Sequence, residues 1–559
     1  MKLIIKEYLT LLKESTELDK LLPDLLLSMS IPPISHPQKG VRQAGVDVAA
    51  VGEHPETKIK TLFLFLIKQG DMGRNDWNVG QQAVRPSLDE IIDVYIPNNI
   101  PANLKNLPIK IIVCTGGILK QDCQQDWSGY TSKEERKGTI EYEFWGGDEL
   151  ATYIEKYLLN AHLLPELLQS KFRRTLVLLD DPDYDCADFY NLLDDLLSPI
   201  QNNKKLILKN FRTINLCLHI IFYWSKNNNN LRPVIYCAER AILNAWDKIK
   251  KYNLKKNPKI TASYQAMLET LLSVYCSYIE KIQKSCQTSN GLSGYSHDYI
   301  LECLTIHENL GFLGIAGHLL LSTAIIEQSE THIKHTHAIV IILKDFISNH
   351  KSTRSPCYDS HIIEISTAIH LLAIFKQKDF IKEWINNIID SVSFTYFQMN
   401  KYFPIQTENF DLLIDLNISQ NIKKEKLFET SSLLAILAQW CAVLEFDDIY
   451  EAIQKFVEKN FPNCTLQIWY PDHDTEMFLY NSNAGKKSGN AEAPIKLPKT
   501  AKEMLERINQ VQDRVEPMDR MSFYPYGLTF LPLISSRHFR TPILPTYWQK
   551  MALTPSTNA

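Results

Sequence analysis

An aspartate and a lysine at the ends of neighbouring strands are the residues in this sequence best suited to chemistry. Lys68 ends the run TLFLFLIK, which predicts a strand buried on both faces, where an unpaired cation is costly. Asp47 lies in the preceding segment, GVDVAAVG. A short link predicts an antiparallel hairpin, which brings the start of one strand beside the end of the next. A carboxylate that holds Mg²⁺ and a lysine that orients a nucleophile are the minimal parts of a phosphodiesterase.

The elements that must position this pair form a compact α/β unit over residues 1–165. Apolar patterns predict a helix near the N-terminus, interrupted by Pro23, and a second helix that ends near Tyr95. After Thr115 a polar stretch fits either a helix or a loop, and a further helix follows Gly147. Strands are expected at 46–51, 61–68, 109–115 and 139–145.

Residues 45–150 resemble the Mrr-like branch of the PD-(D/E)xK nuclease superfamily, which is found among restriction endonucleases and phage-defence effectors. The resemblance is carried by GVDVAAVG, the strand that ends at Lys68, IIVCTGG at 111–117 and IEYEFWGGDELATYI at 140–154. It implies a restriction-endonuclease-like fold with Asp47 as the metal ligand, Lys68 as the catalytic lysine and Mg²⁺ or Mn²⁺ as the cofactor. In such nucleases an acid of the first helix often completes the metal site, which implies that role for Glu14 or Glu17.

One position departs from the family pattern. The family has Glu, Asp or Gln two residues before the lysine, and this sequence has Leu66, which cannot bind a metal. Substitutes are available in Gln69 and Asp71, just after the strand, or in the pair Gln81 and Gln82. The alternative is that Asp47 and Lys68 form an ion pair in an α/β domain without catalytic activity.

Beyond the α/β unit the composition and the apolar periodicity of the sequence change. Residues 166–200 are acidic and predict a linker, and residues 461–559 predict a mixed α/β region with a strand-like run at 466–480 and a helix at 501–513. Between them, residues 201–460 predict an irregular α-helical array. Its helices are expected at 205–225, 233–252, 260–287, 298–328, 333–349, 359–375, 378–393, 431–444 and 446–459.

A basic segment offers a surface for nucleic acid. Residues 201–290 carry 15 Lys and Arg against 4 Asp and Glu, and a phosphate polymer needs such cations. Trp224, Trp246, Tyr252 and Tyr264 lie among the charges and could stack on bases. The alternative is that these charges lie on the solvated faces of helices. The preferred substrate site lies between the α/β unit and this segment. The candidate contacts are Lys248, Lys250, Lys251, Lys255, Lys256 and Lys259.

Several classes of protein are disfavoured. The 11 cysteines are scattered singly, without metal-ligand spacing, which favours free thiols in a reducing compartment. The N-terminus lacks the pattern of a secretory signal, and no window of 18 residues is apolar and uncharged, so we expect a cytoplasmic protein without a membrane span. There is no GxxxxGK[ST] motif, so any ATP-driven step would need another subunit.

Two functional hypotheses follow. The first is a metal-dependent endonuclease, with DNA favoured over RNA, that acts in phage defence with a helical region that senses a signal or binds a partner. That partner would be a protein such as a separate ATPase or sensor subunit, and self-association is left open. The second is a non-catalytic scaffold, built on a degenerate nuclease fold, that binds nucleic acid or protein.

Overall fold

The structure is a computed structural model of the 559-residue chain. It falls into two compact units, Met1–Pro233 and Val234–Ala559, and each is described here by itself. The structure describes residues 5–6, 9–10, 18–35, 44–54, 57–80, 83–135, 140–158, 166–181, 184–198, 203–293, 298–398, 404–418, 429–481, 489–512, 516–542 and 546–553.

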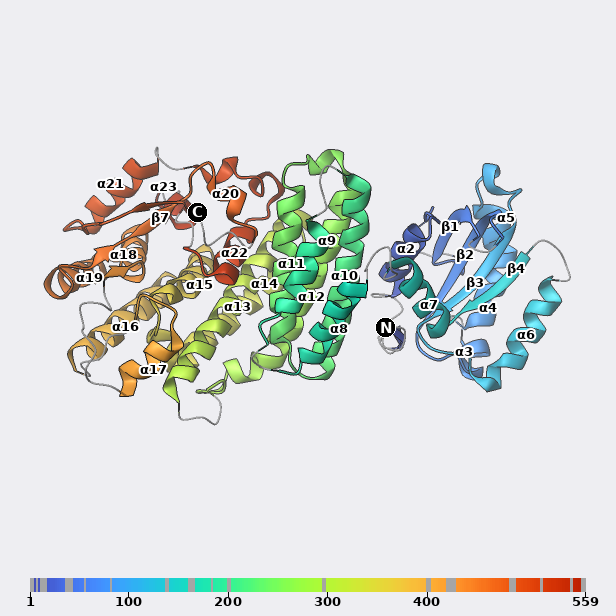
Figure 1. The fold of residues 1–559 in the computed structure, drawn as a ribbon, viewed down its shortest axis with the longest axis horizontal. Helices are drawn as coiled ribbons and strands as arrows, with labels where there is room; N and C mark the ends of the chain where they lie inside the picture. The colour runs from blue at the N-terminus through green and yellow to red at the C-terminus, as the bar shows by residue number, and fades with distance from the viewer. Residues whose placement is uncertain are drawn as a thin grey trace. The chain divides into compact units, whose positions relative to one another are not determined.

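A four-stranded mixed sheet organises the first unit (Figure 1). Its strands lie in the order β1-β2-β3-β4, with β1 antiparallel to β2 and the other neighbours parallel. All four expected strands are present, so the prediction of an α/β region with a sheet is confirmed. Their bounds are β1 Val48–Glu53, β2 Lys60–Lys68, β3 Ile109–Thr115 and β4 Ile140–Trp145.

Helices cover both faces of this sheet (Figure 1). One face packs leucines of β2 against α3, α4 and α6, with Trp77 of α3 edge-on to Trp127 of α6 at 6.1 Å between ring centres. On the other face Phe65 packs against Trp145, which also contacts Tyr153 of α7. The helical elements here are α2 Asp19–Ser28, α3 Arg74–Asn78, α4 Val84–Glu90, the π-helical turn η2 Ile91–Tyr95, α5 Ile96–Asn99, α6 Gln121–Glu135 and α7 Gly147–Tyr153.

The outer edge of β1 is covered by a short segment that follows α2. The Ile34 amide donates to the Ala49 carbonyl at 2.7 Å, and the Val51 amide donates to the Pro32 carbonyl at 3.2 Å. Pro33 forms an isolated bridge with Ala50. Because proline has no N–H to donate, this segment covers β1 without itself becoming a regular strand.

The segment predicted as an acidic linker is folded. It forms α8 (Glu166–Leu178) and α9 (Ala187–Leu197), which pack on one another and on α10 (Lys204–Asn227). The acidic residues of α9 alternate with a row of buried leucines, so the sequence is that of an amphipathic helix. Leucines 192, 193, 196 and 197 are all buried.

The predicted helical array extends across the boundary between the two units, with α10 in the first unit and the later helices in the second. The nine helices expected between residues 205 and 459 are confirmed. Its core helix, α13, is long and apolar enough to cross a membrane, with a mean hydropathy of 1.6, but 78% of that window is buried inside the protein. The helices have the bounds α10 Lys204–Asn227, α11 Arg232–Ile249, α12 Pro258–Cys286, α13 Tyr299–Glu327, α14 Glu330–Asn349, α15 Ile362–Ile374, α16 Lys378–Phe397, α18 Leu433–Val443 and α19 Asp447–Asn460, with α17 Phe410–Ile418 in addition.

The last hundred residues lie in this second unit. Where a strand was expected at 466–480, only β6 (Thr465–Leu466) and β7 (Ile468–Tyr470) are extended, and a helical turn follows. The helix expected at 501–513 is confirmed as α21 (Ala501–Gln512). Farther on, α22 (Leu531–Phe539) carries Arg537, which forms a buried ion pair with Glu239 of α11.

Candidate functional site

The residues predicted to be functional lie along one edge of the sheet, the edge at which its parallel strands end. The parallel strands β2, β3 and β4 end there, at Lys68, Thr115 and Trp145. Because β1 runs antiparallel to β2, its start, preceded by Asp47, lies at the same edge. Ligands of open α/β sheets bind outside the carboxyl ends of the strands. The topology therefore brings Asp47 and Lys68 to the edge where such a site would form.

Asp47 is held by the backbone of β2. Its amide donates to the Phe65 carbonyl at 2.9 Å, and its carboxylate Oδ2 accepts the Ile67 N–H at 2.7 Å. Burial, with the nearby charge of Asp47, raises the pKa of the Cys114 thiol on β3. A hydrogen bond to an ionised acceptor is stronger than a hydrogen bond to a neutral acceptor. The half-buried carboxylate is thus fixed in front of β2 and close to β3.

Lys68 is half-buried at the last position of β2, where it pairs in register with Thr115 of β3. Asp47 binds the backbone N–H of Ile67, the residue immediately before it. The cation and the carboxylate are therefore anchored at adjacent positions of β2, one through its own strand and the other through a hydrogen bond to that strand.

The loops behind this edge are tied together through backbone groups. The Thr115 hydroxyl donates to the Gly70 carbonyl at 2.5 Å and accepts the Gly117 N–H at 3.2 Å, while the Gly147 N–H donates to the Gly117 carbonyl at 2.7 Å. A Cβ on Gly117 would lie 2.4 Å from the backbone of Gly70, and one on Gly116 would lie 1.8 Å from the Leu9 carbonyl oxygen. The Gly-Gly pair is needed because the chains approach too closely for a side chain.

The proposed substitutes for the missing acid have different surroundings. Gln69 is exposed. Asp71 is exposed and contacts the loop after β3: its Oδ1 accepts the Ile118 N–H at 3.1 Å, and its Oδ2 lies 3.8 Å from the Lys120 ammonium. The structure therefore gives Asp71 a role in joining the loops after β2 and β3. Glu14, Glu17, Gln81 and Gln82 lie outside the described residues.

Leu66 belongs to the apolar core. Its side chain is 2% exposed and packs in one cluster with Leu64 of β2 and Val113 of β3. Because side chains alternate along a strand, positions 62, 64 and 66 face the same helical layer. An acid at this position would have to sit among leucines, so the chain provides no metal ligand here.

The basic segment is only partly available for nucleic acid. Lys248 and Lys250 are half-buried beside Asp247, and the Lys250 ammonium also donates to the Glu476 carbonyl at 2.8 Å. The expectation that Trp246 and Tyr264 stack on bases is wrong, because both are buried on the inner faces of α11 and α12. Lys251, Lys255, Lys256 and Lys259 are exposed.

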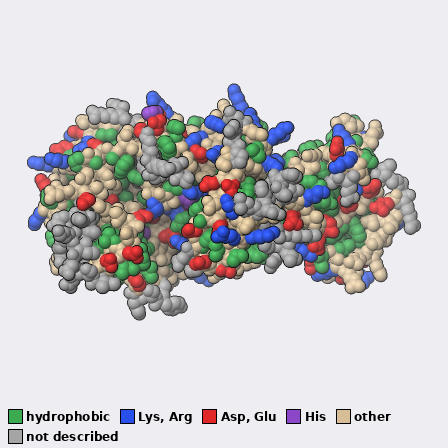
Figure 2. Space-filling model, viewed as in Figure 1, with side chains coloured by type: hydrophobic (Ala, Val, Ile, Leu, Met, Phe, Trp, Pro, Cys, Tyr) green, Lys and Arg blue, Asp and Glu red, His purple; other side chains and the backbone are tan. Residues whose placement is uncertain are grey.

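Figure 2 shows one face of the molecule, on which Lys and Arg side chains are interspersed with Asp and Glu. Among the described side chains visible there, cations do not gather into a single continuous patch. This arrangement fits a solvated surface at least as well as it fits a phosphate-binding track.

A charged cluster on the sheet was not predicted from the sequence. The buried Lys110 ammonium lies 2.6 Å from Glu143, 3.1 Å from Glu141 and 3.0 Å from the His54 imidazole. Burial lowers the pKa of Lys110, but the hydrogen bonds and charges of Glu143 and Glu141 outweigh that effect and raise it. No local pattern joins these residues, which come from three separate segments. A lysine inside the apolar strand IKIIVCT was the available signal.

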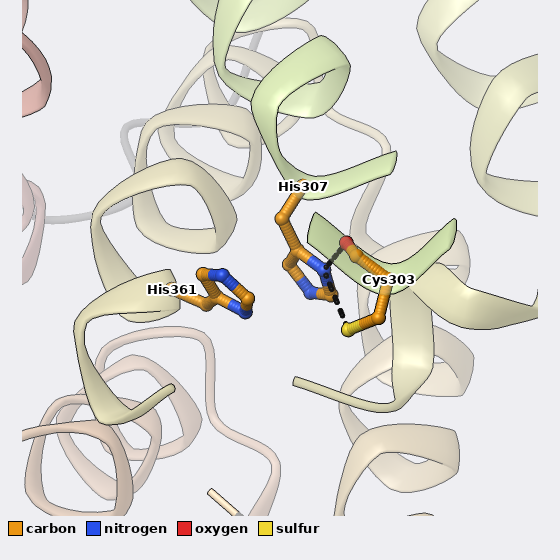
Figure 3. Close-up of side chains that lie close together, drawn as sticks. All are labelled: Cys303, His307 and His361. Atoms are coloured by element: carbon orange, nitrogen blue, oxygen red, sulfur yellow. Dashed lines mark hydrogen bonds between the residues drawn. The ribbon is translucent and has the colours of Figure 1, made fainter. Parts of the chain in front are cut away.

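A second missed cluster lies in the helical unit. It was not expected from the spacing of the cysteines along the chain. Ligand atoms of Cys303, His307 and His361 all lie within 4.8 Å of one another (Figure 3). The signal was a Cys-x₃-His spacing that occurs twice, at Cys303 with His307 and at Cys357 with His361.

Comparison of the chain with protein-family models, with curated proteins and with solved structures finds no match.

Proposed function

We propose that the chain is a metal-dependent nucleic-acid phosphodiesterase, an endonuclease of the PD-(D/E)xK type that acts on DNA. The observation that carries the proposal is the shared sheet edge, at which the Asp47 carboxylate accepts the Ile67 N–H of β2 and Lys68 is the next residue of that strand. A mixed sheet with helices on both faces, in the order and spacing seen here, supports the same fold family.

The described residues fit a magnesium ion in part. Mg²⁺ is commonly held by one or two carboxylates together with water and substrate phosphates. Asp47 would supply one carboxylate, and Glu14, Glu17 or Asp71 would supply another. The ion, when bound, would neutralise charge at the phosphorus and position the attacking water.

The remaining roles fall to residues of this chain. Lys68 would orient the nucleophile and offset the negative charge that develops in the transition state. The exposed lysines near residue 255 would bind the phosphate backbone, and their contribution would weaken as salt increases. The helical unit would then sense a phage signal or dock a separate ATPase or sensor protein.

A second candidate is favoured by the burial of Leu66. Since the expected acid is replaced by a core leucine, the sheet could serve a scaffold that binds nucleic acid or protein without cutting it. The two functions differ in whether metal-dependent cleavage depends on Asp47 and Lys68.

The experiment is cleavage of plasmid DNA and of single-stranded RNA by the purified chain, with Mg²⁺ or Mn²⁺ and with EDTA. The test variants are Asp47→Asn, which keeps an acceptor for the Ile67 N–H, and Lys68→Ala. The matched controls are Glu53→Gln and Lys60→Ala, a register pair on the same two strands at the opposite edge of the sheet.

We expect metal-dependent cutting of DNA that both test variants lose, by a factor of at least about 100, and that both controls keep. Cutting that survives in Asp47→Asn and Lys68→Ala would contradict the proposal. Metal-independent binding of DNA without cutting, unaffected by either test variant, would favour the scaffold.

A further inference from the structure

Two Cys-x₃-His segments meet inside the helical unit. Cys303 and His307 are one turn apart on α13, so their side chains share a face of that helix. Cys357 and His361 lie in the turn that leads into α15. All four residues are buried, and none of them is more than 4% exposed. Nothing in the α/β unit or its proposed activity requires them to be together.

Their ligand atoms lie close enough together to surround one ion. One ligand atom from each of Cys303, His307 and His361 lies within 4.8 Å of the other two. Cys357 brings in the second sulfur, because it lines the same cavity as Cys303 and its backbone N–H donates to the His361 Nδ1 at 3.3 Å. Zinc bonds of about 2.3 Å to sulfur and about 2.0 Å to nitrogen place ligand atoms roughly 3.3–3.8 Å apart.

One nitrogen in the cluster lacks a partner. The His307 Nδ1 lies 2.9 Å from the Cys303 carbonyl oxygen (Figure 3), so it carries the proton and donates to that oxygen. The Nε2 is then an acceptor, and no described group donates to it, although the ring is 0% exposed. A buried acceptor without a donor is costly. A backbone carbonyl that fixes the far nitrogen of an imidazole is the usual support for a metal-bound histidine.

The two imidazoles lie against one another. The His307 and His361 rings stack at 4.0 Å between centres, 10° from parallel. This contact places both rings beside the Cys303 thiol. Neutral imidazole is the form of histidine that binds metal.

The cluster is also accessible. A cavity of about 530 Å³ has Cys303 and Cys357 in its lining, with Lys351, Arg354 and Asp390 among its polar residues. An ion can therefore reach the thiols from solvent without unfolding of the helices, which meets the requirement for an entry path.

We infer that Cys303, His307, Cys357 and His361 form a structural zinc site. Four protein ligands complete the tetrahedron, which distinguishes a structural site from a catalytic one. Zinc binding releases the two thiol protons. It also requires one ring to leave the stack, because the lone pair of a nitrogen lies in the ring plane. His361 is the ring that turns, since its Nδ1 accepts only a long hydrogen bond, 3.3 Å, from the Cys357 N–H. The site would join α13 to the start of α15.

The test measures the zinc content of the full chain, purified with a reductant, incubated with Zn²⁺ and desalted. We expect about one zinc per chain in the parent, and a loss of at least about tenfold in affinity in Cys303→Ala, Cys357→Ala and His307→Ala. The controls are Cys441→Ala, a buried cysteine elsewhere in the same unit, and Asp47→Asn, and both should keep the zinc.

A second measurement needs no variant. Cobalt(II) bound to two thiolates and two imidazoles in a tetrahedron gives intense visible absorption, which excess Zn²⁺ removes. A parent protein that takes up no zinc in stoichiometric amount and shows no such spectrum would overturn the inference. A Cys303–Cys357 disulfide in the reduced preparation would overturn it as well. Neither outcome depends on nuclease activity, so this inference and the proposed function can fail separately.

Discussion

The ion pair between Glu239 and Arg537 predicts a large loss of stability from a small change. Glu239 is 0% exposed and Arg537 is 4% exposed, and the carboxylate also accepts hydrogen bonds from Tyr275 and lies 3.2 Å from the His538 Nδ1. Burial raises the pKa of Glu239, but the charge of Arg537 and the hydrogen bond with His538 outweigh it and hold that pKa below its usual range. The carboxylate is therefore ionised in the folded unit and neutralises a buried guanidinium.

Glu239→Gln keeps the shape of the side chain and removes its charge, so the buried Arg537 loses the carboxylate with which it is paired. Removing one partner of a buried pair costs about 3–5 kcal/mol. For a unit of this size that corresponds to a fall in Tm of roughly 5–10 °C. Scanning calorimetry can follow this, because the transition of the second unit should move while that of the first unit stays.

The matched control is Lys382→Ala, which breaks the surface pair with Asp448 at 3.0 Å, whose side chains are 43% and 67% exposed. Exposed pairs contribute about 1 kcal/mol or less, so this variant should melt within about 1–2 °C of the parent. If Glu239→Gln also melts within that range, the burial of an uncompensated cation is not what the fold depends on, and the reasoning fails.

Three further predictions concern the first unit. Burial raises the pKa of Glu143, but the hydrogen bonds from Lys110 and Trp145 outweigh it and lower that pKa. The unfolded state therefore binds more protons than the folded state as the pH falls, and the free energy of unfolding should decrease below about pH 4. Urea titrations should show a shallower decrease for Glu143→Gln. Gly117→Ala should cost about 2 kcal/mol or more in the same urea titrations, because its Cβ would meet the Gly70 backbone. Gly129→Ala, in the exposed middle of α6 with open space around it, should stabilise by up to about 1 kcal/mol.

Much of the α/β fold could be predicted from the sequence because its strands are apolar runs between turn residues. The sharing of one edge by Asp47 and Lys68 followed from strand order alone. The polar stretch after Thr115 was harder. It forms α6, in which only Cys123 and Thr131 are fully buried, so its apolar periodicity was too weak to separate a helix from a loop.

Other features depended on contacts between segments far apart in the sequence. Trp246 and Tyr264 lie among lysines along the chain, but helical geometry turns them inward. The sequence pattern predicts Cys303 and Cys357 to be ordinary core residues, since each is apolar and lies in or beside a helix. Only the packing of α13 against the start of α15 brings the two Cys-x₃-His segments together.

The segment that covers β1 bears on how the chain avoids joining other chains during synthesis. Residues 31–35 leave the ribosome before β1, so the strand meets a partner that closes its outer side as soon as it forms. An open strand edge is a template for intermolecular pairing and amyloid growth, and proline and charge are the usual safeguards. The opposite strand, β4, carries Glu141 and Glu143, so each end of the sheet has its own protection against aggregation.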